Sequence, residues 1–240
     1  MQKVLTLSKR ELTSLFYSPV AYMTFAVFAF VSGLLFVFGV FEPGYQASMS
    51  DMFVGMVWLL VFVVPAISMR LISEESSTGT IELLMTAPIS DTHIVLGKWL
   101  GSFGFFVVLL LPIFFQIVVL EVQADPDYGP IVTGLLGILL IGAFYLSIGV
   151  FVSALSRSQL VAFMITILIT GLLTIGMYVL STSSFVPNSI KAALYYMNVN
   201  EQYKGFARGL IDIRNFVFFL SGTVLFLFLG VKSLGLRRMQ

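Results

Sequence analysis

The feature that most constrains the fold is a series of long apolar stretches separated by short polar segments. A helix rises about 1.5 Å per residue, so about 20 apolar residues are enough to cross a hydrocarbon core roughly 30 Å thick. Stretches of about this length fall at residues 20–41, 52–69, 94–120, 131–154, 160–180 and 216–234. The sequence therefore predicts an all-α membrane protein with six transmembrane helices. Pro65 and Pro112 lie inside the second and third stretches and are expected to kink them.

The composition excludes an ordinary soluble domain. Hydrophobic residues make up 58% of the chain and charged residues only 10%, whereas soluble domains have about 25% charged residues. A soluble protein of this length would have too few ionisable groups to cover its surface. The net charge of +1 indicates neither a nucleic-acid partner nor an acidic one. The absence of cysteine excludes disulfides and thiol chemistry.

The distribution of Lys and Arg predicts the orientation. Of the 13 basic residues, 9 lie near the two chain ends, in the segments after the second and fourth stretches, or at the start of the third stretch, and 4 lie within residues 181–215. Cytoplasmic segments of membrane proteins carry the excess of Lys and Arg. Both ends of the chain and residues 70–93 are therefore expected in the cytoplasm, and residues 181–215 outside.

The apolar stretches lack the groups that intramembrane chemistry needs. None of them contains an acidic residue or a histidine, and a proton relay or an intramembrane protease needs such a titratable group at depth. A phosphate-binding loop is also missing, because Thr92 stands at its first glycine position and Trp99 follows Lys98. We therefore predict no catalytic residue, no metal site and no ATP site in this chain, so any energy must come from another polypeptide.

The polar segment between the second and third stretches is the main candidate for a functional site. Thr80 is expected to cap a short helix that runs to about residue 87, with Gly79 as a flexible entry and Pro88 as its stop. Ser90 is expected to cap the next helix, with Asp91 in its first turn. A short rigid helix between two membrane helices can act as a lever. On spacing alone, an ordinary cytoplasmic loop is an equally good interpretation.

This segment resembles the cytoplasmic coupling segment of ABC-2 type transporter permeases. That segment has an acidic pair, a Gly-Thr-x-Glu-Leu-Leu core, a proline and a Gly-Lys pair. The matching residues here are Glu74, Glu75, Gly79, Thr80, Glu82, Leu83, Leu84, Pro88, Gly97 and Lys98. The resemblance implies that Glu74, Glu75, Gly79, Thr80, Glu82, Leu83 and Pro88 couple the permease to an ATPase. Ser76, Ser77 and Thr78 replace the basic residues that many relatives carry after the acidic pair.

The resemblance extends over the whole chain as a single ABC-2 type transmembrane domain, residues 1–240. It implies an amphipathic interfacial helix over residues 1–18, a coupling segment over 70–93 and an external segment over 181–215. In the first helix, Val4, Leu5, Leu12, Leu15 and Phe16 are expected to face lipid, and Lys9, Arg10 and Glu11 to face water. Residues 206–215 resemble the gliding-motility-associated branch of these permeases.

The resemblance also implies a function and partners. The chain would be the permease subunit of an ATP-driven ABC exporter in the bacterial cytoplasmic (inner) membrane. It would contact a cytoplasmic ABC ATPase subunit, a second identical or related permease, an auxiliary envelope protein and membrane lipid, but no nucleic acid. The partner ATPase would bind ATP and Mg, and this chain would hold no cofactor. The cargo stays open, since relatives move polysaccharides, lipids, peptides and drugs. The alternative is a membrane anchor or scaffold of a larger envelope complex, without transport activity of its own.

A stripe of small and mildly polar residues recurs every four positions on the fifth stretch. It consists of Ala162, Thr166, Thr170, Thr174 and Tyr178. Close helix packing, with hydroxyl groups bonded to backbone carbonyls, is favoured over the lining of a translocation path. Gly97-x-x-x-Gly101 is likewise expected to be a helix-packing motif.

Overall fold

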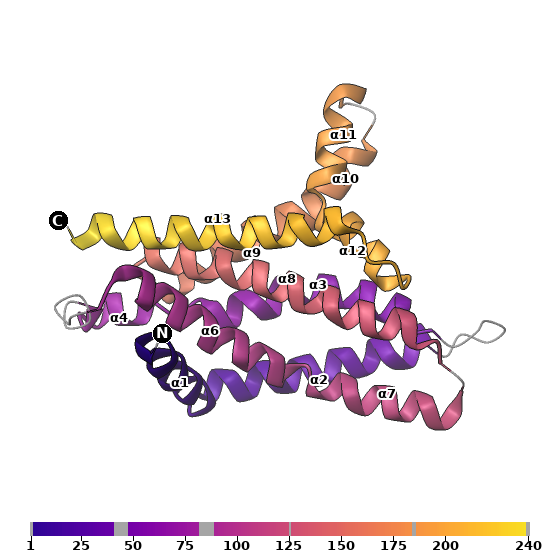
Figure 1. Cartoon of the computed structure of the whole chain (residues 1–240), viewed down its shortest axis with the longest axis horizontal. Coiled ribbons are helices and arrows are strands. Elements are labelled where there is room, and N and C mark those ends of the chain that lie inside the picture. Colours follow the sequence, from indigo (N-terminus) through magenta and orange to yellow (C-terminus); the bar gives the residue numbers. More distant parts are fainter. Residues whose placement is uncertain (1, 41–47, 82–88, 125, 184–185, 239–240) are drawn as a thin grey trace.

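The computed structural model describes residues 2–40, 48–81, 89–124, 126–183 and 186–238. Most of these residues are helical, and none of them lies in a β-strand. The helices are α1 (Gln2–Phe16), α2 (Pro19–Val40), α3 (Ser50–Ser68), α4 (Ser73–Ser77), α6 (Asp91–Leu109), α7 (Leu111–Gln123), α8 (Tyr128–Leu155), α9 (Gln159–Gly171), η1 (Leu172–Gly176), α10 (Met177–Thr182), α11 (Asn188–Met197), α12 (Val199–Ala207) and α13 (Ile213–Arg238). Over this part of the chain, the all-α prediction is confirmed (Figure 1).

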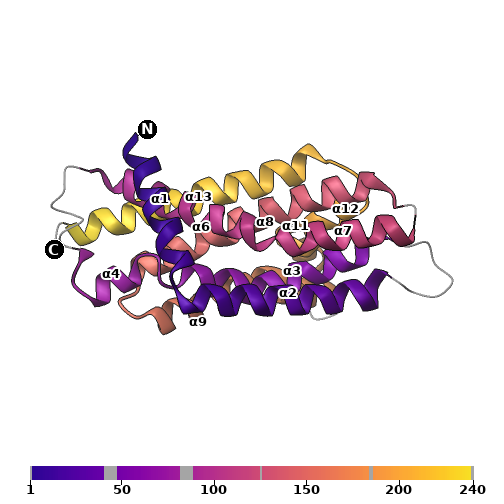
Figure 2. The same ribbon diagram turned by 90° about the horizontal axis from the view of Figure 1, so that it is seen from below.

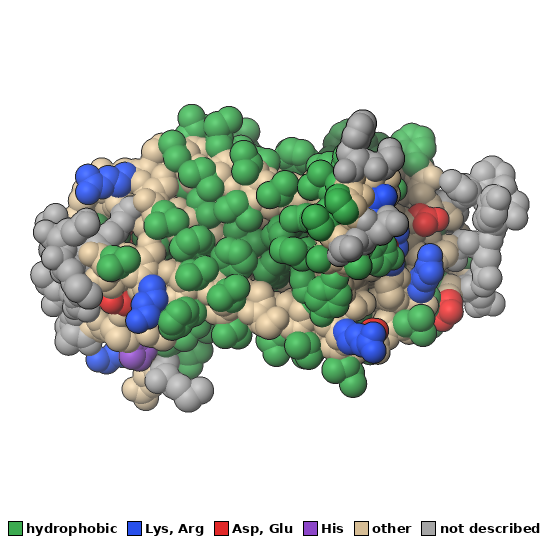
Figure 3. Space-filling view, turned by 90° about the horizontal axis from the view of Figure 1, so that it is seen from above, with side chains coloured by type: hydrophobic (Ala, Val, Ile, Leu, Met, Phe, Trp, Pro, Cys, Tyr) green, Lys and Arg blue, Asp and Glu red, His purple; other side chains and the backbone are tan. Residues whose placement is uncertain are grey.

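Six helical units are long and apolar enough to cross a membrane, as predicted. They are Pro19–Val40, Ser50–Ser77, Asp91–Gln123, Tyr128–Leu155, Gln159–Thr182 and Ile213–Leu236. Apart from α10, these units run along the long axis of the molecule (Figures 1 and 2). Hydrophobic side chains cover the middle of the face in Figure 3, while charged side chains gather towards its two ends. This distribution is typical of a multi-pass membrane protein.

The centre of the bundle is formed by α3 and α8, which are more buried than the other spans. Large side chains such as Phe53 and Tyr145 are completely enclosed there. The two helices approach very closely at one point, because a Cβ on Gly149 of α8 would lie 1.9 Å from Ser68 Oγ at the end of α3. A larger residue at position 149 would push these helices apart, so the glycine fixes how α3 ends against α8.

Two of the spans are interrupted within the apolar stretch that was predicted for them. The third changes from α6 to α7 at Leu110, and Pro112 lies in the first turn of α7. This interruption was predicted, because proline lacks the backbone N–H that a continuous helix needs. The fifth span was predicted as one helix over residues 160–180, but it contains the π-helical turn η1 between α9 and α10. Beyond η1, α10 and α11 stand away from the bundle (Figure 1).

Helix α12 packs against the end of α8 that lies furthest from the start of α1. Tyr203 OH donates to the carbonyl of Gly134 at 3.1 Å, and Thr133 Oγ1 donates to the carbonyl of Phe206 at 2.6 Å. Burial raises the pKa of the Tyr203 phenol, which therefore stays protonated and keeps its role as a donor. These contacts hold the connection between the last two spans against the central helix.

Helix α1 lies across the bundle at the terminal end, defined here as the end where α1 begins and α13 finishes (Figures 1 and 2). The expectation for its faces was wrong at two positions. Leu15 was expected at lipid but is 2% exposed, and Glu11 was expected in water but is 8% exposed. The reason is close packing on α6: Cβ atoms on Gly97 and Gly101 would lie 2.6 Å from Leu7 Cβ and 2.7 Å from Glu11 Cβ. The predicted packing motif, Gly97 and Gly101, therefore packs against α1.

Candidate functional site

The polar segment that follows α3 is anchored on α8. Ser153 Oγ of α8 accepts the backbone N–H groups of Ile72 and Ser73, both at 2.9 Å, and donates to the carbonyl of Met69 at 3.2 Å. Leu71 and Ile72 are buried in an apolar cluster at this end of the bundle. One buried hydroxyl therefore satisfies the backbone where α4 begins and fixes the base of the segment.

Charged side chains join this segment to two other helices. Lys98 of α6 is 3% exposed. Its Nζ lies 3.0 Å from Glu11 Oε2 of α1 and 3.0 Å from Glu75 Oε1 of α4. Glu75 Oε1 also lies 3.3 Å from Arg10 Nη2 of α1. We call these four residues, Arg10, Glu11, Glu75 and Lys98, the polar junction.

The polar junction is balanced in charge, with two cations and two carboxylates. Lys98 and Glu11 are its most buried members, with side-chain exposures of 4% and 10%. An unpaired charge at such a position is costly, and removing one partner of a buried ion pair typically costs about 3–5 kcal/mol. The pairing therefore holds α1 to α6, because separating these two helices would leave Lys98 without Glu11. Glu75 joins α4 to the same lysine.

A second set of contacts joins the base of the segment to the end of α1. Arg70 Nε lies 3.3 Å from Glu74 Oε2. The Arg70 guanidinium also donates to Ser14 Oγ at 3.3 Å and to Ser18 Oγ. A cavity of about 360 Å³ is lined by the polar junction together with Ser14, Arg70 and Glu74, and it also reaches Thr78 and Thr80. The acidic pair singled out in the sequence is thus divided, with Glu75 directed to Lys98 and Glu74 to Arg70.

The remaining predicted coupling residues follow α4. Gly79 has a φ of +74°, a left-handed conformation that favours glycine. Thr80 Oγ1 lies 2.9 Å from Thr78 Oγ1. Glu82, Leu83 and Pro88 lie outside the described residues, as does most of the helix predicted from Thr80 to residue 87.

The predicted start of the next helix is confirmed. Ser90 is the N-cap of α6, and its Oγ accepts the backbone N–H of His93 at 3.3 Å. Asp91 lies in the first turn of this helix, as predicted. A negative charge at this position interacts favourably with the partial positive charge of the helix N-terminus.

Sequence reasoning missed the partners of Lys98. A lysine about one turn inside an apolar stretch was the available signal, because such a cation needs a partner. Its partner Glu11 was predicted to face water, because it follows the charged residues Lys9 and Arg10 directly in the sequence. Ser153 was missed as well, because a serine inside an apolar helix gives no sign of which backbone groups it will bind.

The stripe on the fifth span lies in two environments. Thr166, Thr170 and Thr174 are fully buried. Thr170 Oγ1 donates to the carbonyl of Thr166 at 2.9 Å and lies 3.5 Å from the carbonyl of Val61 on α3. Thr174 is hydrogen-bonded to Tyr145 of α8. Tyr178 lies beyond η1 and is 40% exposed, so it does not share these surroundings.

The fold and the position of this site define a class of protein: a multi-pass helical membrane protein with a buried ion pair, Lys98 with Glu11, at its terminal end. A family model described as "ABC-2 family transporter protein" matches residues 5–235, and the chain belongs to this family. No curated protein matches the sequence. Family membership implies the permease component of an ABC transporter, which lacks an ATP site of its own and generally works with a cytoplasmic ABC ATPase.

Proposed function

We propose that this chain is the permease subunit of an ABC exporter and that residues 70–93 couple it to the ATPase through the polar junction. The observation that carries the proposal is the position of Lys98. It is buried in the third span and lies 3.0 Å from Glu75 of the predicted coupling segment and 3.0 Å from Glu11 of α1. A displacement of the segment would therefore be transmitted to both helices.

The mechanical argument depends on where the segment is held. Ser153 binds its base to α8, Lys98 binds Glu75 to α6, and Arg10 binds the same carboxylate to α1. A force on a loop that is free at its base would be lost in loop motion. Here the same force would act on α8, α6 and α1 together, and two of these helices are membrane spans. This is the property required of a coupling element.

The proposed orientation places the terminal end in the cytoplasm. The basic residues support it, with 9 of 13 assigned to that side by the positions of the apolar stretches. Helix α4, which precedes the predicted coupling helix, lies at the same end as the start of α1 and the finish of α13 (Figure 1). A cytoplasmic ATPase could then reach the segment, while α11 and α12 would face the outside.

The proposed assembly contains two permeases, identical or related, and two cytoplasmic ATPase subunits that bind ATP and Mg. An auxiliary envelope protein completes it, and the bacterial inner membrane is its proposed location. The resemblance of residues 206–215 supports a place in the gliding-motility-associated branch. For the fifth span, the burial of Thr166, Thr170 and Thr174 supports helix packing over the lining of a path.

Two measurements test the coupling proposal. Affinity purification of the tagged chain in mild detergent should recover a soluble ATPase that contains a phosphate-binding loop. With this complex, Glu75→Gln should leave ATPase binding intact and lower the permease-dependent ATP hydrolysis roughly tenfold, since a hydrogen bond to a charged group contributes about 1.5–3 kcal/mol. Glu121→Gln removes a carboxylate at the opposite end and is the matched control.

The outcomes separate the candidate functions. If no ATPase is recovered, the chain is better explained as a membrane anchor or scaffold. If the ATPase binds, and its complex with the Glu75→Gln variant hydrolyses ATP at the same permease-dependent rate as its complex with the Glu121→Gln variant, the polar junction does not transmit the coupling.

A further inference from the structure

An apolar slot opens on the side of the bundle where α1 turns into α2. It has a volume of about 290 Å³, and its lining side chains are apolar or aromatic. Phe16 comes from α1, Tyr22 and Phe25 from α2, and Phe105, Val108 and Leu111 from the third span. The break between α6 and α7 at Leu110 lies beside it. The slot is therefore a product of the bend in the third span and the turn after α1.

The position of the slot indicates what can enter it. The Phe16 and Phe105 rings meet edge to face, with centroids 5.4 Å apart. The remaining lining comes from membrane-spanning helices, and Tyr22 and Leu111 are 65% and 54% exposed. The mouth of the slot therefore faces the hydrocarbon of the bilayer. An acyl chain fits this environment, whereas a polar ligand would lose its hydration without any hydrogen-bonding partner.

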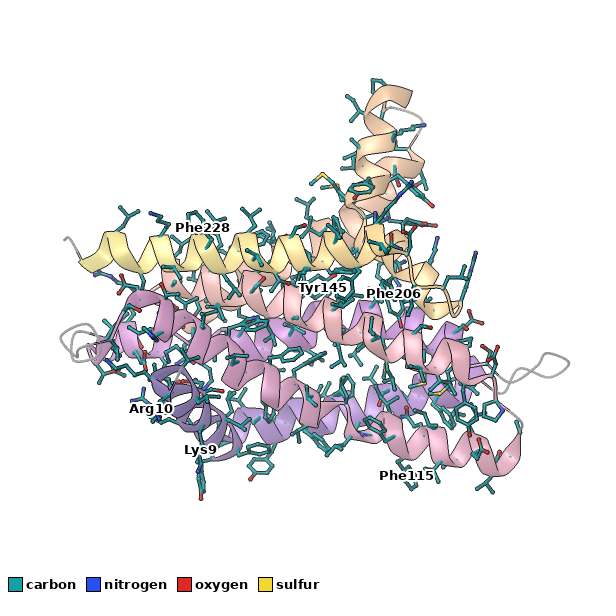
Figure 4. All side chains as sticks on the ribbon, viewed as in Figure 1. Lys9, Arg10, Phe115, Tyr145, Phe206 and Phe228 are labelled. Carbon is teal, nitrogen blue, oxygen red and sulfur yellow. The ribbon has the colours of Figure 1, made fainter. Side chains whose placement is uncertain are left out.

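A cation lies on the same face of α1 as the slot. Lys9 precedes Phe16 by seven residues, which is about two helical turns or roughly 10 Å along the axis. Its side chain points away from the bundle in Figure 4. Within the described residues it has no ion pair, whereas the neighbouring charges are engaged: Arg10 with Glu75 and Glu11 with Lys98. Tyr17, 84% exposed, adds a phenol beside it.

We propose that the slot and Lys9 together bind one anionic phospholipid of the leaflet at the terminal end. An acyl chain occupies the slot between Phe25, Phe105 and Val108, and the phosphate group lies against Lys9 and the Tyr17 hydroxyl. The apolar slot supplies affinity for any phospholipid, while Lys9 supplies the preference for a negative headgroup. This inference concerns a different surface from the polar junction and does not depend on ATPase coupling.

The test is lipid titration of the purified full chain in detergent, read by native mass spectrometry. Phosphatidylglycerol should bind roughly fivefold more tightly than phosphatidylcholine, as expected for one lysine near an anionic headgroup. Lys9→Gln should bring this ratio close to one. Lys232→Gln removes a different lysine, located on α13, and should leave the ratio unchanged.

The slot is tested with variants that fill it. Val108→Trp should weaken the binding of both lipids at least fivefold, whereas Val107→Trp, on the neighbouring residue outside the slot, should not. If Val108→Trp does not fold, Leu111→Phe fills the slot from an exposed position and should give the same result. The proposal is overturned if Lys9→Gln keeps the preference, if the slot-filling variants bind like Val107→Trp, or if free glycerol phosphate competes as well as the whole lipid.

Discussion

Replacing Lys98 with methionine is the most direct test of how the terminal end is held together. The substitution keeps a long side chain and removes the charge. Glu11 then loses the only ion-pair partner it has within the described residues, and its side chain is 10% exposed. An uncompensated buried charge of this kind costs about 3–5 kcal/mol. Glu75 keeps Arg10, but this arginine is 58% exposed, so that pair contributes only about 0.2–1 kcal/mol.

The free energy of unfolding, measured by SDS titration of the purified chain, should therefore fall by about 3–5 kcal/mol for Lys98→Met. The double variant Lys98→Met with Glu11→Leu should recover most of this loss, because replacing a buried ion pair with apolar side chains is often neutral or stabilising. Arg10→Gln is the control at the exposed edge of the polar junction and should lose no more than about 1 kcal/mol.

The double variant tests whether Lys98 and Glu11 interact energetically. If the Lys98→Met and Glu11→Leu losses simply add in the double variant, the two side chains do not interact energetically. The ion pairs of the polar junction would then contribute little to stability, and they would not hold α1 to α6. A loss below 1 kcal/mol for Lys98→Met alone would refute the reasoning in the same way.

Two further predictions concern topology and the fifth span. Because the native chain has no cysteine, single cysteines can be labelled without background. Asp127→Cys should react with an impermeant thiol reagent added outside intact cells, whereas Thr78→Cys and Ser158→Cys should not. External labelling of Thr78→Cys would reverse the proposed orientation. Thr170→Trp should disrupt helix association, as measured by native gel electrophoresis, because Thr170 is fully enclosed next to Val61 of α3. A variant that assembles normally on the gel but fails in a transport assay would instead support a translocation path.

Much of the fold could be predicted from local sequence. The six spans follow from stretches of apolar residues, and the break near Pro112 follows from the chemistry of proline. The N-cap at Ser90 was also predicted, because a serine before the first helical residue binds a backbone N–H only a few residues away. Each of these features depends on residues close together in the chain, which is why the sequence reveals them.

The candidate site could be predicted only in part. The acidic pair Glu74 and Glu75 was identified from the motif, but the motif does not show that the two carboxylates have different partners. Glu82, Leu83 and Pro88 remain predictions, since they lie outside the described residues. The π-helical turn η1 in the fifth span was not predicted, because its residues are as apolar as those of the flanking helices.

The sequence by itself determined that this chain crosses a membrane as helices and that its polar segment lies between the second and third spans. Only the tertiary structure decided that Glu11 is buried and that it meets Lys98, 87 positions away along the chain. The glycines of α6 could have received any helix with a suitable face, and they receive α1. Hydropathy is a property of each residue and its neighbours, whereas the partner of a buried charge is set by which helices pack together.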